Sequence, residues 1–104
     1  MDLMSLKLEF SGGTETLFNM QKELHIKVPT KSGPILIVDL LQFIYDNLMV
    51  GNPRANLFVE NGGKNIRSGI LVLVNEVDWE LLQGPKTILK QGDVISFIST
   101  LHGG

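Results

Sequence analysis

The sequence predicts an α+β fold in which a small mixed β-sheet carries one main helix across one face. Two regions, residues 4–10 and 24–28, alternate apolar and polar side chains with a period of two, which is typical of half-buried strands. In residues 37–49 the apolar side chains instead recur at i, i+3, i+4 and i+7, the spacing of an amphipathic helix. Strands and helix together favour a single two-layer domain.

The first two strands are expected to form a hairpin. The first is followed by the turn signal Ser11-Gly12-Gly13, and the second ends at Pro29. The helix that comes next is closed by Gly51 and Pro53, but it begins without a Ser, Thr, Asn or Asp cap. We therefore expect Asp39, in its first turn, to satisfy the free backbone amides there.

The second half of the chain supplies a short apolar stretch at residues 57–59, a continuous apolar run at 70–74 and a last strand at 94–100. On the last strand we expect Ile95 and Phe97 to face the helix. This order, with a late central strand, describes the β-grasp roll, as in ubiquitin-like proteins. We divide the chain into a β-grasp domain, residues 1–98, and a flexible Gly-Gly tail, residues 99–104.

Composition excludes several classes of protein. The 104 residues carry a net charge of −2 without a basic stripe, so direct nucleic-acid binding is not expected. No apolar run approaches the length of a membrane span, and the N-terminus does not resemble a signal peptide. These features predict a soluble intracellular protein. The absence of cysteine excludes a disulfide scaffold, a thiolate nucleophile, a cysteine-based zinc site and a thiolate-ligated iron–sulfur cluster.

Catalytic and metal-binding patterns are missing as well. The two histidines, His25 and His102, have no recognisable partner in sequence, and His25 is expected to face water from a strand. The segment Gly62-Gly63-Lys64-Asn65 lacks the Ser or Thr that ends a phosphate-binding loop. We therefore expect neither an enzyme nor a metal site.

The C-terminus is the feature with chemistry of its own. The chain ends in the letters STLHGG, residues 99–104. A terminal carboxylate becomes electrophilic once ATP adenylates it, and two residues without a Cβ can pass through a narrow channel to the nucleotide. Six extended residues reach about 20 Å, enough to enter another protein's active site. A frayed end would also look like this, so Gly-Gly alone leaves both readings open.

Four segments carry a family resemblance that spans essentially the whole chain. SGILVLVNEVDWELL and LKQGDVISFISTLHGG, together with LEFSGGTETLF and VDLLQFIYDNL, closely resemble the eukaryotic ubiquitin-related modifier family of sulfur carriers. The resemblance implies a β-grasp fold. It implies that an ATP-dependent activating enzyme of the Uba/MoeB type adenylates Gly104, and that a rhodanese-like domain of that enzyme supplies persulfide sulfur. The product would be a thiocarboxylate at Gly104.

The same resemblance implies what happens next. A tRNA-thiolating complex would pass the sulfur to the wobble uridine of certain tRNAs, and the activated C-terminus would also be joined to lysines of target proteins. ATP belongs to the activating enzyme, and no cofactor is expected on the chain itself. A monomer in the cytoplasm, and also in the nucleus, suits a carrier handed between enzymes.

The resemblance also assigns residues. Gly104 carries the reacting carboxyl, and Gly103 gives clearance beside it. Leu101 and His102 would lie along the partner's channel, and Thr100 would belong to the flexible exit.

Two residues of the last strand are expected on the outer face of the sheet. Ile98 and Ser96 alternate with the core-facing positions, so both would point away from the helix. We expect Ile98 to be part of an exposed apolar patch on which a partner docks.

Two alternatives stay open. A carrier of the MoaD or ThiS type would form the same thiocarboxylate for molybdopterin or thiazole synthesis, with a different acceptor. A non-catalytic β-grasp interaction module would have an inert tail, and residues appended after Gly104 would leave its function untouched.

Overall fold

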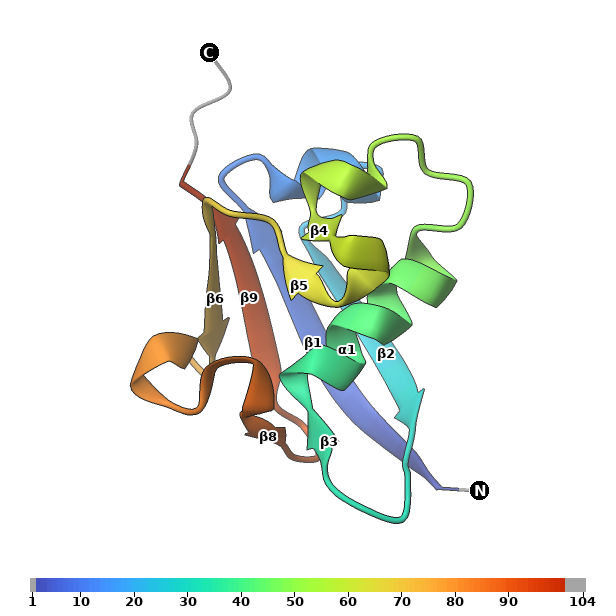
Figure 1. Cartoon of the computed structure of the whole chain (residues 1–104), viewed down its shortest axis with the longest axis vertical. Coiled ribbons are helices and arrows are strands. Elements are labelled where there is room, and N and C mark those ends of the chain that lie inside the picture. Colours follow the sequence, from blue (N-terminus) through green and yellow to red (C-terminus); the bar gives the residue numbers. More distant parts are fainter. Residues whose placement is uncertain (1, 101–104) are drawn as a thin grey trace.

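A five-stranded mixed sheet forms one layer of the structure, a computed structural model that describes residues 2–100 (Figure 1). The strand order is β2-β1-β9-β6-β7, in which β1 pairs parallel with β9 and the other neighbours are antiparallel. The last strand therefore occupies the centre of the sheet. From one edge to the other the strands span Glu23–Pro29, Leu3–Ser11, Val94–Ser99, Ile70–Val74 and Val77–Asp78.

The second layer is a single long helix that crosses one face of the sheet (Figure 1). Helix α1 spans Ile37–Phe43 and continues as a π-helical turn over Ile44–Leu48. Its apolar side chains at the predicted helical spacing are fully buried against the sheet. Within residues 2–100, no helix has the length and apolarity that crossing a membrane requires.

The start of α1 is closed by Asp39, as expected. The Asp39 Oδ2 atom accepts the backbone N–H of Leu36 at 2.8 Å, and Oδ1 accepts the Lys31 ammonium at 2.8 Å. Burial alone would raise the pKa of Asp39, but the hydrogen bonds from Lys31 and Leu36 and the charge of Lys31 outweigh it and hold that pKa below its ordinary value. The helix start therefore depends on an ionised Asp39.

Several short elements complete the roll. Two-residue strands pair as β3 (Ile35–Leu36) with β8 (Ile88–Leu89), and as β4 (Val59–Glu60) with β5 (Asn65–Ile66). Tight 3₁₀ turns occupy Thr14–Phe18, Ala55–Leu57, Asn61–Gly63, Trp79–Leu81 and Gly84–Lys86.

An aromatic cluster lies at the centre of the core. The rings of Phe10 and Phe18 stack with centroids 4.1 Å apart, and Phe58 meets both Phe18 and Phe97 edge-on at 5.0 Å. Three of these four side chains come from segments that are distant in sequence, β1, β9 and the turn before β4. The cluster therefore fixes the end of the sheet from which the tail leaves.

The predicted fold class and the predicted orientation of the last strand are confirmed. Ile95 and Phe97 are fully buried on the helix side. Strand β9 ends at Ser99, one residue before the end of the predicted strand at residues 94–100 and one residue inside the predicted tail at residues 99–104. Of the apolar stretch at residues 57–59, only Val59 enters a strand.

Candidate functional site

The root of the tail is the last described part of the chain. The central position of β9 makes it a rigid base, and Thr100 is held just beyond it by the carbonyl oxygen of Gly69. Sequence analysis assigned the reacting carboxyl and the threading role to residues that lie outside the described residues: Leu101, His102, Gly103 and Gly104. Of the predicted tail, residues 99–104, the structure therefore places only Ser99 and Thr100, and it holds Thr100 by hydrogen bonds to Gly69 where a flexible exit was expected.

Gly12 packs directly on this root. Its φ of 68° is in the left-handed region, and a Cβ built there would lie 2.5 Å from the carbonyl oxygen of Ser99. Thr14, two residues on, donates its hydroxyl to the Phe97 carbonyl oxygen at 2.8 Å. The turn after β1 is thereby attached to the end of β9. The sequence showed Gly12 only as a turn residue, because this contact is tertiary.

The outer face of the sheet carries an apolar patch around Ile98. The register places Ile98 opposite Leu71, with Leu73 in the next row of β6. All three side chains are half-buried and lie on the face away from the helix, since their neighbours Val72, Phe97 and Val74 are buried on the other face. We call Leu71, Leu73 and Ile98 the outer patch.

Ser96 lies on the same outer face but offers little surface to a partner. Only 9% of its area is exposed, and its hydroxyl donates to the Glu9 carboxylate at 3.1 Å. The long Glu9 side chain, one strand away, covers it. The surface at Ser96 is therefore that of the Glu9 side chain. The sequence analysis did not name Glu9.

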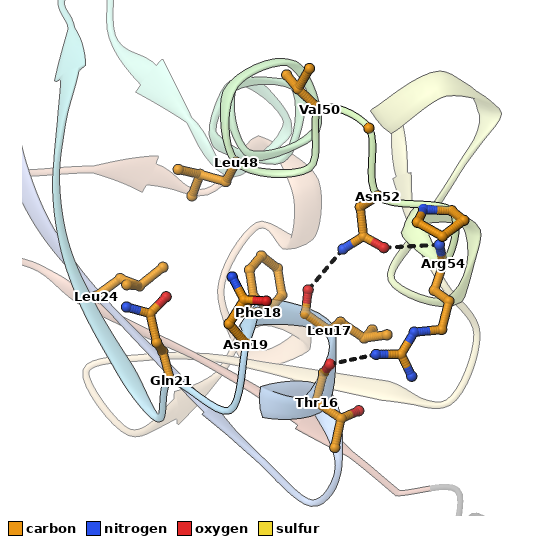
Figure 2. Close-up of a pocket in the computed structure, with 12 residues that line it drawn as sticks. Thr16, Leu17, Phe18, Asn19, Gln21, Leu24, Leu48, Val50, Asn52 and Arg54 are labelled. Atoms are coloured by element: carbon orange, nitrogen blue, oxygen red, sulfur yellow. Dashed lines mark hydrogen bonds between the residues drawn. The ribbon is translucent and has the colours of Figure 1, made fainter.

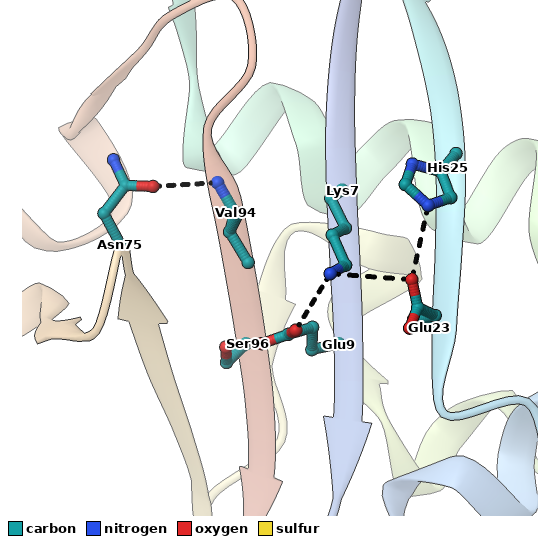
Figure 3. Close-up of polar contacts among 7 residues, drawn as sticks. All are labelled: Lys7, Glu9, Glu23, His25, Asn75, Val94 and Ser96. Carbon is teal, nitrogen blue, oxygen red and sulfur yellow. Dashed lines mark hydrogen bonds and ion pairs between the residues drawn. The ribbon is translucent and has the colours of Figure 1, made fainter.

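A charged strip lies beside the outer patch on β1 and β2 (Figure 3). The Lys7 ammonium lies 3.4 Å from the Glu9 carboxylate and 3.5 Å from that of Glu23, and His25 Nε2 lies 3.3 Å from Glu23. The charge of Glu23 and then the hydrogen bond to Glu9 raise the pKa of Lys7 above its ordinary value. The His25 side chain is exposed, as predicted. These exposed groups make a polar margin to the outer patch.

One hollow among the described residues lacks the side chains of a catalytic site. It is a cleft of about 520 Å³ between the 3₁₀ turn after β1 and the loop after α1 (Figure 2). Asn52 donates to the Leu17 carbonyl oxygen at 2.9 Å and Arg54 to that of Thr16 at 2.7 Å, so these groups join the two segments. Arg54 is the one ionisable side chain lining the cleft in the described part of the chain, so no acid–base pair forms there.

Residues 2–100 likewise hold no group of three or more His, Asp or Glu side chains that could bind a metal ion. Sequence reasoning missed Leu71 and Leu73, which lie beside Ile98 in the outer patch. The apolar run at residues 70–74 was the signal, because half of any strand's side chains face outward.

Comparison with known proteins agrees with this arrangement. The family described as Urm1 (Ubiquitin related modifier) matches residues 5–104. The chain is 45% identical to the ubiquitin-related modifier 1 homolog of Chlamydomonas reinhardtii, over 98% of this chain and 100% of that protein.

Solved structures agree on the fold. The solution structure of Urm1 from Trypanosoma brucei superposes with a TM-score of 0.68 at 34% identity, and the match covers 100% of this chain and 99% of that one. The small archaeal modifier protein 1 of Methanosarcina acetivorans, at 19% identity and 100% coverage of both chains, shares the fold with a TM-score of 0.70. The chain therefore belongs to the ubiquitin-related modifier family, and it is a ubiquitin-like sulfur carrier and protein modifier, not an enzyme.

Proposed function

We propose that the carboxyl group of Gly104 is the working group of this protein and that a separate ATP-dependent enzyme activates it. A carboxylate oxygen would attack the α-phosphate of ATP, with pyrophosphate as leaving group, to give an acyl-adenylate. A persulfide on a rhodanese-like domain would then attack the acyl carbon and release AMP. A thiol of the enzyme then attacks the resulting acyl disulfide and forms a disulfide with the cysteine of the rhodanese-like domain, and the thiocarboxylate on Gly104 is the leaving group.

The observation that supports this proposal is the root of the tail. β9 is the central strand of the sheet, and Thr100 beyond it is tied to Gly69, so the chain leaves the domain from a fixed point. The residues after Thr100 would then be free to enter a channel, with Leu101 and His102 along its wall and Gly103 giving clearance at the nucleotide. A carrier of this kind needs no acid–base pair of its own.

The outer patch is the proposed docking surface for the activating enzyme. Leu71, Leu73 and Ile98 are half-buried apolar side chains on one face of the sheet, bordered by the charged strip. Apolar centres with polar margins are typical of protein interfaces. Ile98 is two residues from Thr100, so an enzyme that binds the patch also reaches the tail.

Downstream, we propose two fates for the activated end. A tRNA-thiolating complex takes the sulfur to the wobble uridine of tRNA, or a lysine amine of a target protein attacks the activated carbonyl and forms an isopeptide bond. The chain carries a net charge of −2, so we expect the complex and not this protein to hold the tRNA. The cytoplasm, and the nucleus as a second compartment, provide both acceptors.

The test is the intact mass of the chain after incubation with ATP, thiosulfate and an activating enzyme that is active on its own ubiquitin-related modifier. We expect a mass increase equal to the replacement of one oxygen by one sulfur, localised to Gly104. The matched controls are a chain without Gly104 and a chain with one alanine appended after it, and neither should shift.

Two results would redirect the proposal. An unshifted wild-type chain beside an enzyme active on its own carrier would point to an interaction module with an inert tail. A thiocarboxylate that a molybdopterin or thiazole synthase accepts, and a tRNA-thiolating complex does not, would indicate a carrier of the MoaD or ThiS type.

A further inference from the structure

A second hollow adjoins the root of the tail. It is a groove of about 380 Å³ between the turn after β1 and the loop that leads into β6, two segments that lie at the tail's end of the sheet (Figure 1). Gly12 and Ser99 line it on the side of the tail. Its apolar lining comes from Leu17, Leu57 and Ile70, of which Leu57 is 43% exposed. The groove therefore offers an accessible apolar surface next to the point where the tail begins.

Both arginines of the chain line this groove, although they are distant in sequence. Arg54 donates through Nη2 to the Thr16 carbonyl oxygen at 2.7 Å, as Figure 2 shows, and Arg67 donates through Nη1 to the Asn56 carbonyl oxygen at 3.0 Å. A guanidinium has five N–H donors, so each retains donors beyond the single bond that holds it. The seven lysines all lie outside the lining of the groove.

No carboxylate neutralises these two charges within the described part of the chain. The groove is lined by no Asp or Glu, and neither arginine takes part in an ion pair among residues 2–100. A planar guanidinium held by a backbone carbonyl is pre-organised for a carboxylate, which lysine is not.

We infer that this groove binds an acidic segment of the activating enzyme, one that places a carboxylate on Arg54 and Arg67 and an apolar side chain against Leu57 and Ile70. The inference rests on the proposed function, because it assumes an enzyme that receives the tail. Any such enzyme must take up the chain directly after Thr100, and Ser99, one residue before Thr100, lines the groove. The groove and the outer patch would then hold the domain from both sides of the tail.

Two other occupants fit the groove less well. The chain's own residues 101–104 end in a carboxylate, but docking them would cost the conformational entropy of two glycines. The gain would be only the contact of one leucine side chain and one exposed ion pair. A tRNA backbone would need a longer run of cations than two arginines, and it gains nothing from the exposed leucine. A partner that is already folded places a carboxylate and an apolar side chain with less ordering.

The experiment measures adenylation of the full chain by ATP–pyrophosphate exchange, as a function of carrier concentration and of salt. The groove variants are R54Q/R67Q and L57S. The matched controls are K86Q, which removes a positive charge on a distant turn, and L81S, which removes an 80% exposed leucine outside the groove. Thermal unfolding of each variant shows that the domain is intact.

We expect R54Q/R67Q to raise the KM for the carrier about tenfold with kcat unchanged, and L57S to raise it about threefold. The KM of the wild type should rise with salt, and that dependence should flatten in R54Q/R67Q alone. A merely structural role of the arginines would leave the salt dependence as it is in the wild type.

Four results would overturn the inference. A wild-type KM in both folded groove variants would do so while leaving the proposed function intact. A lower KM in R54Q/R67Q would assign the groove to the chain's own tail, and normal adenylation with impaired tRNA thiolation would assign it to a nucleic acid. If the wild type itself is not adenylated, the proposed function fails and this inference with it.

Discussion

Thr100 donates both its backbone N–H and its hydroxyl to the carbonyl oxygen of Gly69, each at 2.8 Å. These two hydrogen bonds fix the backbone for one residue beyond the end of β9. The consequence is a defined boundary between the part of the chain that the fold holds and the part that a partner must take up.

Replacing Thr100 by Val should loosen this boundary without unfolding the domain. The variant keeps the shape and the backbone N–H but removes the hydroxyl donor, and we expect a loss of about 0.5–1 kcal/mol in the free energy of unfolding. Hydrogen exchange should show faster exchange of the Thr100 amide. T30V, which removes a comparable exposed hydroxyl bond to Asp2, should leave that amide as it is. Equal protection of Thr100 in wild type and T100V would contradict the prediction.

Replacing Gly12 by Ala should lower the free energy of unfolding by more than the strain of a left-handed backbone alone would lower it. A φ of 68° is unfavourable in conformational free energy for any residue with a Cβ. The new methyl group would also lie 2.5 Å from the Ser99 carbonyl oxygen. We expect a loss of at least about 2 kcal/mol, measured by urea denaturation. G51A is the matched control, because Gly51 has a φ of 73° and open space around its Cβ position. Equal losses in the two variants would show that the β9 contact is unimportant.

Asp39 should make stability depend on pH. Its pKa is lowered on folding, so its contribution is present above the unfolded value of about 3.8 and is lost as the pH falls through the folded value. We expect D39N to lose about 1 kcal/mol at pH 7, and the difference from wild type to shrink in acid. D46N removes a carboxylate near the other end of the helix and should show a smaller loss. A pH-independent difference in urea titrations would exclude this role for Asp39.

The outer patch should decide how tightly the activating enzyme binds. L73S and I98S each remove part of an apolar contact, and we expect each to raise the KM for the carrier about tenfold with kcat unchanged. The salt dependence of KM should stay as in the wild type, which separates the patch from the arginine groove. L81S, on the exposed turn after β7, is the control. An unchanged KM in both folded variants would remove the outer patch from the interface.

The long elements were predictable from sequence because each has enough residues to show a period. Side chains alternate over several residues of β1 and β2, and the helical repeat continues from α1 through the π-helical turn that follows it. The spacing of the apolar side chains therefore predicts which of them are buried. The paired elements β3–β8 and β4–β5 were not predicted. Two-residue strands have no period, and only the tertiary fold brings their partners together.

Some residues of the candidate site were likewise predictable from sequence, and others depend on the tertiary fold. Gly104 and Ile98 could be named from sequence, one from its chemistry at a chain end and the other from its position in an alternating strand. Arg54 and Arg67 could not be brought together, since neither their spacing nor their neighbours share a pattern. The cover that Glu9 provides over Ser96 also depends on the pairing of β1 with β9, which joins the first and last strands of the fold.

That pairing has a mechanical consequence. A force applied to the C-terminus, for example when a conjugated target is pulled into a narrow pore, enters the domain along β9. Five residue pairs to β1 and five to β6 flank this strand, and their hydrogen bonds run across the direction of pull. The ladders would have to shear together instead of opening one bond at a time. The strand that presents the tail to enzymes is therefore also the one best placed to resist extraction.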